Sequence, residues 1–184
     1  MNNNCMQIII VGLSCSGKDT LGEYINHRYK VKHISASDHA KKISRIDGSI
    51  IDSNELANTV DDYLKKCGKA KVAEYIYNKY LKNNDTNRSF VITGFRYKEE
   101  YEYIKKRFSN LILISVSADL DVRFKRNLIR ARQGYMKDKS KFRELDLLQN
   151  EMGLIPFSHI DADYKLINST TFDDLFAKTS KILD

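Results

Sequence analysis

The segment from residue 12 to residue 20 limits what this chain can fold into more than any other. It reads Gly-Leu-Ser-Cys-Ser-Gly-Lys-Asp-Thr and matches the pattern G-x-x-x-x-G-K. The apolar residues 5–11 before it indicate a buried strand, and residues 19–29 indicate a helix. Glycines let such a loop curl its backbone N–H groups around an anion, and the helix start adds its positive end. The segment therefore predicts a phosphate-binding loop.

In this context we expect the loop to hold the phosphates of ATP. Lys18 should reach the β- and γ-phosphates as a point charge. A glycine turn before an ordinary helix is the alternative, which the strand before the motif and the helix after it disfavour. The residues expected to contact the nucleotide are Gly12, Ser14, Cys15, Ser16, Gly17, Lys18, Asp19 and Thr20.

One position departs from the usual motif. The residue after the lysine is commonly Ser or Thr, whose hydroxyl binds Mg²⁺. Here Asp19 holds that position and Thr20 follows it. A carboxylate there could bind Mg²⁺ through a water molecule or cap the helix start. We take Asp19 as the candidate magnesium ligand, which leaves Thr20 for the α-phosphate.

The remainder of the chain alternates apolar strands with helices. Strands are expected at 31–34, 90–92, 111–116 and 164–167, with a helical stretch at 54–81 that breaks at Gly68 and loops at 46–53 and 83–87. Continuous apolar strands between helices indicate a parallel sheet covered on both faces. The pattern predicts one α/β domain over residues 1–184, with a five-stranded parallel sheet and a ligand site beyond the carboxyl ends of its strands.

Composition narrows the possible partners. The net charge of +7 attracts polyanions, either nucleic acid or a small phosphorylated ligand. No basic repeat interleaved with aromatic residues is present, which makes nucleic acid the less favoured partner. No apolar run is long enough to span a bilayer, residues 6–11 are too short for a signal peptide, and the three cysteines lack metal-ligand spacing. We expect a cytoplasmic protein, as a monomer or a homodimer.

Several motifs resemble known families. The sequence S-G-K-D-T resembles deoxynucleoside monophosphate kinases and animal phosphomevalonate kinases. The rest is similar to the adenylate-kinase-related archaeal P-loop family, itself similar to dephospho-CoA kinases. The matching segments are Thr93-Gly94-Phe95-Arg96, Arg123-Phe124-Lys125-Arg126, Arg130-Ala131-Arg132, residues 142–154 and residues 162–168. Residues 46–87 match least.

The resemblance implies a three-layer P-loop NTPase fold with a small helical lid at about 123–145 and an acceptor-binding helical segment at about 46–87. It implies an ATP- and Mg²⁺-dependent kinase of a small phosphorylated acceptor, with a nucleoside or deoxynucleoside monophosphate as the first choice. A dephospho-CoA-type kinase is one alternative. A degenerate nucleotide-binding protein is another, because Thr93 stands where relatives usually have an aspartate that aids Mg²⁺.

The same resemblance assigns roles to charged residues outside the loop. Arg96 would hold the phosphate of the acceptor, although it could instead pair with Glu99 or Glu100. Arg123, Arg126 and Arg130 share a helix face, and Arg126 and Arg130 would neutralise charge on the moving phosphoryl group. The alternative for these two is an exposed basic helix. Asp38 would contact the acceptor or take its proton, or else cap the next helix. The expected catalytic set is Lys18, Arg96, Arg126, Arg130 and Asp38.

Overall fold

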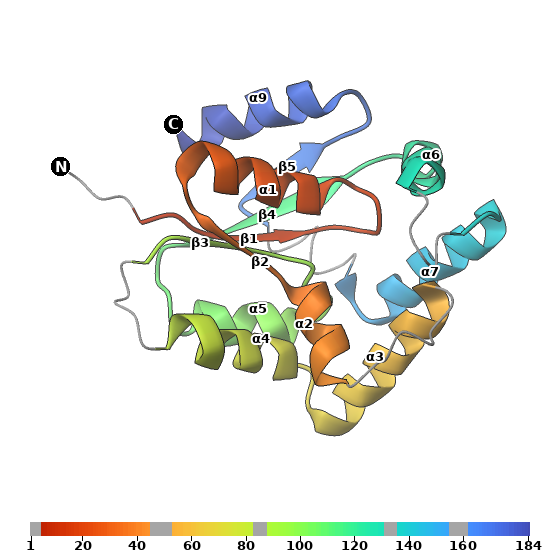
Figure 1. Ribbon diagram of the computed structural model, residues 1–184, viewed down its shortest axis with the longest axis horizontal. Helices are drawn as coiled ribbons and strands as arrows, with labels where there is room; N and C mark the ends of the chain where they lie inside the picture. Colours follow the sequence, from red (N-terminus) through yellow and green to blue (C-terminus); the bar gives the residue numbers. More distant parts are fainter. Residues whose placement is uncertain (1–4, 45–52, 83–87, 131–135, 155–161) are drawn as a thin grey trace.

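The computed structural model describes residues 5–44, 53–82, 88–130, 136–154 and 162–184. Five parallel strands form one sheet in the order β2-β3-β1-β4-β5 (Figure 1). Every ladder is parallel, and Ile10 of the central strand pairs with Thr93 on one side and Ile114 on the other. The strands are β1 (Gln7–Val11), β2 (Lys32–Ser35), β3 (Phe90–Thr93), β4 (Leu111–Ser117) and β5 (Tyr164–Ile167). The predicted sheet is confirmed.

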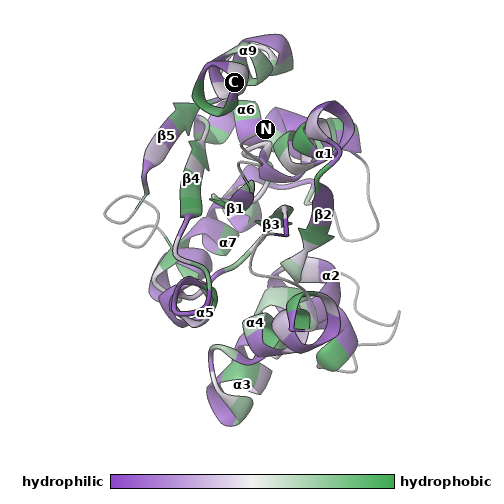
Figure 2. Ribbon diagram, turned by 90° about the vertical axis from the view of Figure 1, so that its left-hand side faces the viewer, coloured by the Kyte–Doolittle hydropathy of each residue, from purple (hydrophilic) through white to green (hydrophobic). Residues whose placement is uncertain are grey.

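The central strand shows why the fold has three layers. Its side chains alternate between the two faces of the sheet, and none of them is exposed. Ile8 and Ile10 pack with helices α1 (Lys18–Tyr29) and α9 (Phe172–Leu183). Ile9 and Val11 pack on the other face with α4 (Lys71–Ile76) and α5 (Lys98–Lys105). Figures 1 and 2 show these two pairs of helices on opposite sides of the sheet.

Four further helices lie around the carboxyl ends of the strands. Helices α3 and α7 pack against each other, and α6 also contacts α7 (Figure 1). Side chains from all four line a cavity beside the phosphate loop. The helices are α2 (Ala36–Ile43), α3 (Ser53–Cys67), α6 (Leu120–Arg130) and α7 (Lys139–Glu151). None of the helices in the described residues combines the length and the apolarity needed to cross a bilayer.

Capping side chains explain where the helices differ from expectation. Helix α2 begins at Ala36 because the Ser35 hydroxyl accepts a hydrogen bond from the Asp38 backbone N–H at 3.3 Å. The interpretation of Asp38 as the cap is therefore wrong. The break at Gly68 is confirmed, and a π-helix at Tyr77–Leu81, which was not predicted, follows α4. Residues 46–52 of the expected loop at 46–53, the expected loop at 83–87 and residues 131–135 of the expected lid lie outside the described residues. Residue 53 begins α3 instead of ending a loop.

Candidate active site

The phosphate loop is curled as the glycine pattern predicted. Gly17 precedes α1 with φ +102°, and Cys15 also has a positive φ of 61°. The backbone N–H of Ser16 donates to the Leu13 carbonyl at 3.2 Å and closes the turn. The Ser16 side chain is fully buried, and its hydroxyl has no hydrogen-bond partner among the described residues. A buried orphan hydroxyl is rare in native proteins and is consistent with a ligand that satisfies it.

Two glycines with nearly the same φ give a matched test of this loop. A Cβ on Gly17 would lie 2.3 Å from Nδ2 of the buried Asn168, whereas a Cβ on Gly68 (φ +104°) would meet nothing within 4 Å. Gly68→Ala should therefore cost only the left-handed penalty of about 1–2 kcal/mol. Gly17→Ala should cost about 1–3 kcal/mol more, because overpacking adds to that penalty. Urea unfolding of the two variants checks this, and equal losses would contradict it.

Side chains from α6 and the end of β5 hold the loop at Ser16. The Asn168 Nδ2 donates to the Ser16 carbonyl at 2.8 Å, and the Arg126 Nη1 donates to the same carbonyl at 3.4 Å. Arg126 also donates to the Asn168 backbone carbonyl at 2.9 Å and lies 4.9 Å above the Phe172 ring. These contacts fix the loop before a ligand arrives, which lowers the cost of organising the site.

A second set of contacts ties the loop to α7 through Ser14. The Arg123 guanidinium donates to the Ser14 carbonyl at 3.3 Å and pairs with the Asp146 carboxylate at 2.8 and 2.5 Å. Gln149 Nε2 donates to the Ser14 hydroxyl at 3.0 Å. Arg123 and Gln149 are only 4% and 3% exposed. Arg123 therefore holds the loop in place through Ser14 and Asp146. The three arginines expected on one face of α6 do not all point toward one ligand.

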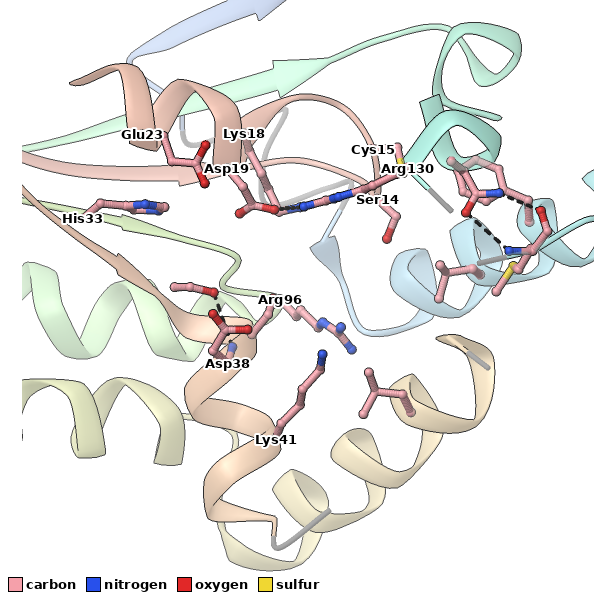
Figure 3. Close-up of a pocket in the computed structure, with 17 residues that line it drawn as sticks. Ser14, Cys15, Lys18, Asp19, Glu23, His33, Asp38, Lys41, Arg96 and Arg130 are labelled. Atoms are coloured by element: carbon pink, nitrogen blue, oxygen red, sulfur yellow. Dashed lines mark hydrogen bonds and ion pairs between the residues drawn. The ribbon is translucent and has the colours of Figure 1, made fainter. Parts of the chain in front are cut away.

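The first cavity, about 440 Å³ in volume, lies between the phosphate loop and α2, α3 and α7. In Figure 3, Lys18, Asp19 and Arg130 lie on one side of it, and Arg96, Asp38 and Lys41 lie on the other. Apolar side chains of α3, α7 and the residues before α7 complete the wall: Leu56, Met136, Phe142 and Leu145. The cavity thus brings together both groups of charged residues that the sequence predicted separately.

A second cavity of about 430 Å³ lies on the outer side of the loop. Its lining adds Gly17, Thr20, Arg126, Ile129 and Phe172 to five residues shared with the first cavity. The shared residues are Cys15, Lys18, Asp19, Glu23 and Arg130. The two cavities therefore meet at the loop. Arg126 lines only the second one, so it lies apart from Arg96 and Asp38.

The electrostatics at the meeting point favour an ionised carboxylate. Lys18 Nζ lies 3.8 Å from the Asp19 carboxylate. The ammonium group lowers the pKa of Asp19 below its usual value, and the hydroxyl of Thr93 and the charge of Arg130 act in the same direction against burial. Burial raises the pKa of the Cys15 thiol, although Lys18 and Arg130 oppose this. Cys15 is therefore less reactive than an exposed thiol.

The described residues around Asp19 fit Mg²⁺. Magnesium in phosphoryl-transfer sites usually keeps several waters and is held by one or two carboxylates together with substrate phosphates. Asp19 supplies one carboxylate, with a side chain 33% exposed beside Lys18. No group of three or more His, Cys, Asp and Glu residues that could cage a metal occurs in the part of the chain that the structure describes. A single carboxylate next to phosphates is the arrangement that magnesium accepts.

Arg96 is a cation of the site with a buried, unpartnered donor. Its Nη1 is buried and has no hydrogen-bond partner among the described residues. Burial lowers the pKa of Arg96, while Glu100 and Asp61 oppose this. The Glu100 side chain accepts from the backbone N–H groups of Arg96 at 2.7 Å and Tyr97 at 2.9 Å, rather than from the guanidinium of Arg96. Burial raises the pKa of Glu100 to about 8. The guanidinium is thus positioned by its backbone and turned into the first cavity.

Sequence reasoning missed three titratable residues that line the first cavity: Glu23, His33 and Lys41. Glu23 and Lys41 follow Asp19 and Asp38 at i+4 and i+3, so helical spacing could have revealed them. No local signal marks His33. Its Nε2 lies 2.9 Å from the Thr93 hydroxyl, sixty positions away in the chain. His39 lies against the rings of Tyr75 and Tyr80.

Several solved structures with this architecture are kinases. The structure resembles shikimate kinase from Acinetobacter baumannii in complex with shikimate (TM-score 0.61, 14% identity, 98% of this chain and 94% of that chain). It also resembles shikimate kinase from Bacteroides thetaiotaomicron (TM-score 0.61, 16% identity, 97% and 98%) and a sugar kinase from Janibacter (TM-score 0.59, 16% identity, 98% and 95%). At such identities the likeness shows a shared P-loop kinase fold.

No curated protein matches the sequence. Residues 8–150 match a family of AAA domains, AAA_18, and this stretch contains the phosphate loop, four of the five strands and most of the first cavity. The chain therefore belongs to the AAA_18 family of AAA domains, with a P-loop kinase fold.

Proposed function

We propose that this protein is an ATP-dependent kinase of the cytoplasm that transfers the γ-phosphoryl group to a small phosphorylated acceptor. One observation carries the proposal: the buried, unpartnered Nη1 of Arg96 lines a cavity whose opposite wall is the phosphate loop. A buried N–H donor without an acceptor is costly, and an acceptor phosphate would remove that cost. The resemblance to solved kinases across nearly the whole chain supports the same activity.

In this proposal the chain mainly positions phosphates, which is most of what phosphoryl transfer requires. Lys18 and the loop amides hold the β- and γ-phosphates, and Arg130 at the rim of both cavities neutralises charge on the transferred group. Arg126 lies over the Phe172 ring in the second cavity, and the base of ATP would stack beside this pair. Asp19 would hold Mg²⁺, which neutralises phosphate charge when bound.

The acceptor that fits best is a nucleoside or deoxynucleoside monophosphate. Arg96 and Lys41 are cations on the acceptor side of the first cavity, and Phe142 with Leu56 offers an apolar wall for a base. The cavity is large enough for a small ligand of this kind. A phosphate acceptor is already an anion at neutral pH and needs no base.

Asp38 supports a second candidate, an acceptor that reacts through a hydroxyl group, as in a dephospho-CoA-type kinase. Ser35 serves as the helix cap, so capping does not account for the carboxylate at position 38. Asp38 lies in the first cavity with Arg96, where it could take a proton from an alcohol. A nucleotide binder without turnover is the remaining alternative, since Thr93 offers no charge to a metal.

An acceptor screen tests the proposal. Purified protein is incubated with ATP, Mg²⁺ and a panel of nucleoside and deoxynucleoside monophosphates, dephospho-CoA and shikimate, and ADP release is measured. We expect one class of phosphorylated acceptor to stimulate ADP release, and Lys18→Met to abolish the stimulation. Tight ATP binding without turnover on any acceptor would overturn the kinase proposal and favour the nucleotide binder.

A further inference from the structure

Asp19, Thr93 and His33 come from three neighbouring elements and form one chain of polar contacts. Asp19 lies in the first turn of α1, Thr93 ends β3 and His33 lies in β2. Thr93 is fully buried, and its hydroxyl is close enough to the Asp19 carboxylate to lower the pKa of that group. On its other side the same hydroxyl lies 2.9 Å from Nε2 of His33. Asp19 and His33 both line the first cavity (Figure 3).

The chemistry of the three groups fixes the direction of this chain. A threonine hydroxyl has one proton to donate, and an ionised carboxylate can only accept. Thr93 therefore donates to Asp19 and accepts from His33, which requires the proton of the imidazole to be on Nε2. Hydrogen bonds are donated from His33 to Thr93 and from Thr93 to Asp19, and this fixes the orientation of the Asp19 carboxylate.

Gly22 shows that the fold makes room for this contact. A Cβ at Gly22 would lie 2.6 Å from the His33 Nε2 and 2.8 Å from the Thr93 Cγ2. Gly22 lies inside helix α1, where glycine costs about 1 kcal/mol relative to alanine. Alanine at this position would collide with both side chains. The helix therefore approaches β2 and β3 closely at the place where the two side chains meet.

P-loop NTPases hold Mg²⁺ with a hydroxyl directly after the loop lysine and an aspartate from elsewhere in the site. Here the carboxylate follows the lysine and the hydroxyl ends the neighbouring strand. We propose that Asp19 and Thr93 are a reciprocal exchange of these two groups, in which Thr93 and His33 position Asp19 to hold the magnesium of the bound nucleotide. This inference rests on the proposed function.

The exchange leaves the charge of the site unchanged. One carboxylate and one hydroxyl face each other in either arrangement, and the Nε2–H of His33 can donate to whichever group ends β3. A single substitution breaks this balance. Asp19→Thr leaves two hydroxyls and no carboxylate, and Thr93→Asp places two carboxylates side by side. The double variant Asp19→Thr/Thr93→Asp restores one of each.

The test measures how strongly Mg²⁺ improves binding of ADP, a readout that does not require the acceptor to be known. ADP affinity is measured by calorimetry with Mg²⁺ and with EDTA in the wild type, in Thr93→Val, in both single exchange variants and in the double variant. We expect the factor by which Mg²⁺ improves ADP affinity to fall about tenfold in Thr93→Val and in Asp19→Thr. A hydrogen bond to a charged group contributes about this much. The double variant should recover most of it.

Thr179→Val is the matched control. Thr179 is as buried as Thr93, but its hydroxyl donates to the Leu175 carbonyl inside α9. It should keep the wild-type effect of Mg²⁺, and thermal melting should show that all variants fold. Losses that add up in the double variant, or an unchanged Mg²⁺ effect in Thr93→Val, would overturn the exchange alone. A folded wild type that binds no ADP would overturn the proposed function and this inference with it.

Discussion

Replacing Lys18 by methionine is expected to lower kcat for phosphoryl transfer by about 10²–10³-fold, the loss seen when one preorganised donor to a transition-state charge is removed. The Lys18 side chain is 13% exposed and lies where the two cavities meet. Methionine keeps much of the length and removes the charge. Steady-state kinetics at saturating ATP, with the acceptor identified in the screen, measure the loss.

Lys125→Met is the control for this variant. Lys125 is an exposed residue of α6 and lines neither cavity, so its loss should leave kcat within about twofold, as for most surface changes. Lys18→Met should also release the Asp19 carboxylate from its main stabilising charge, and the pKa of Asp19 should rise toward its ordinary value. Full activity in Lys18→Met would contradict the assignment of the loop as the donor phosphate site.

The phosphate loop and the sheet could be predicted because local patterns in the sequence indicate both. Gly12 and Gly17 bracket the loop, and the run of isoleucines in β1 requires burial on both faces. The strand order follows from parallel pairing and short connections, which leave few arrangements. The site's position at the carboxyl ends of the strands follows from the same rule.

What could not be predicted depends on contacts between distant parts of the chain. Helical spacing placed Arg123 with Arg126 and Arg130 on one face, but Asp146, twenty-three positions further on, pairs with Arg123 and turns it into a support of the loop. The role of His33 depends on Thr93 in the same way. Spacing along one helix predicts which side chains share a face. The partners that these side chains contact depend on the three-dimensional fold.

Arg96→Met is expected to raise the KM for the acceptor about 10–100-fold while the KM for ATP changes less than twofold. Hydrogen bonds to charged groups are worth about 1.5–3 kcal/mol, and Arg96 lines only the first cavity. Arg96→Lys should restore little, because an ammonium group cannot bind two phosphate oxygens in the plane of a guanidinium fork. Initial-rate kinetics with each substrate varied in turn measure both constants.

Stability separates this binding role from a structural one. The buried Nη1 has no partner among the described residues, so the free protein bears the cost of desolvating it. Removing the guanidinium should therefore leave the free energy of unfolding unchanged or raise it slightly, as happens at sites shaped for a ligand rather than for packing. An arginine retained to pair with Glu100 would behave in the opposite way, since its loss would remove the partner of a buried acidic group and lower the free energy of unfolding. Urea unfolding of Arg96→Met, together with the acceptor KM, decides between the two roles. A large loss of stability with an unchanged acceptor KM would make Arg96 a structural residue. An unchanged stability with a raised acceptor KM would make Arg96 the residue that binds the acceptor phosphate.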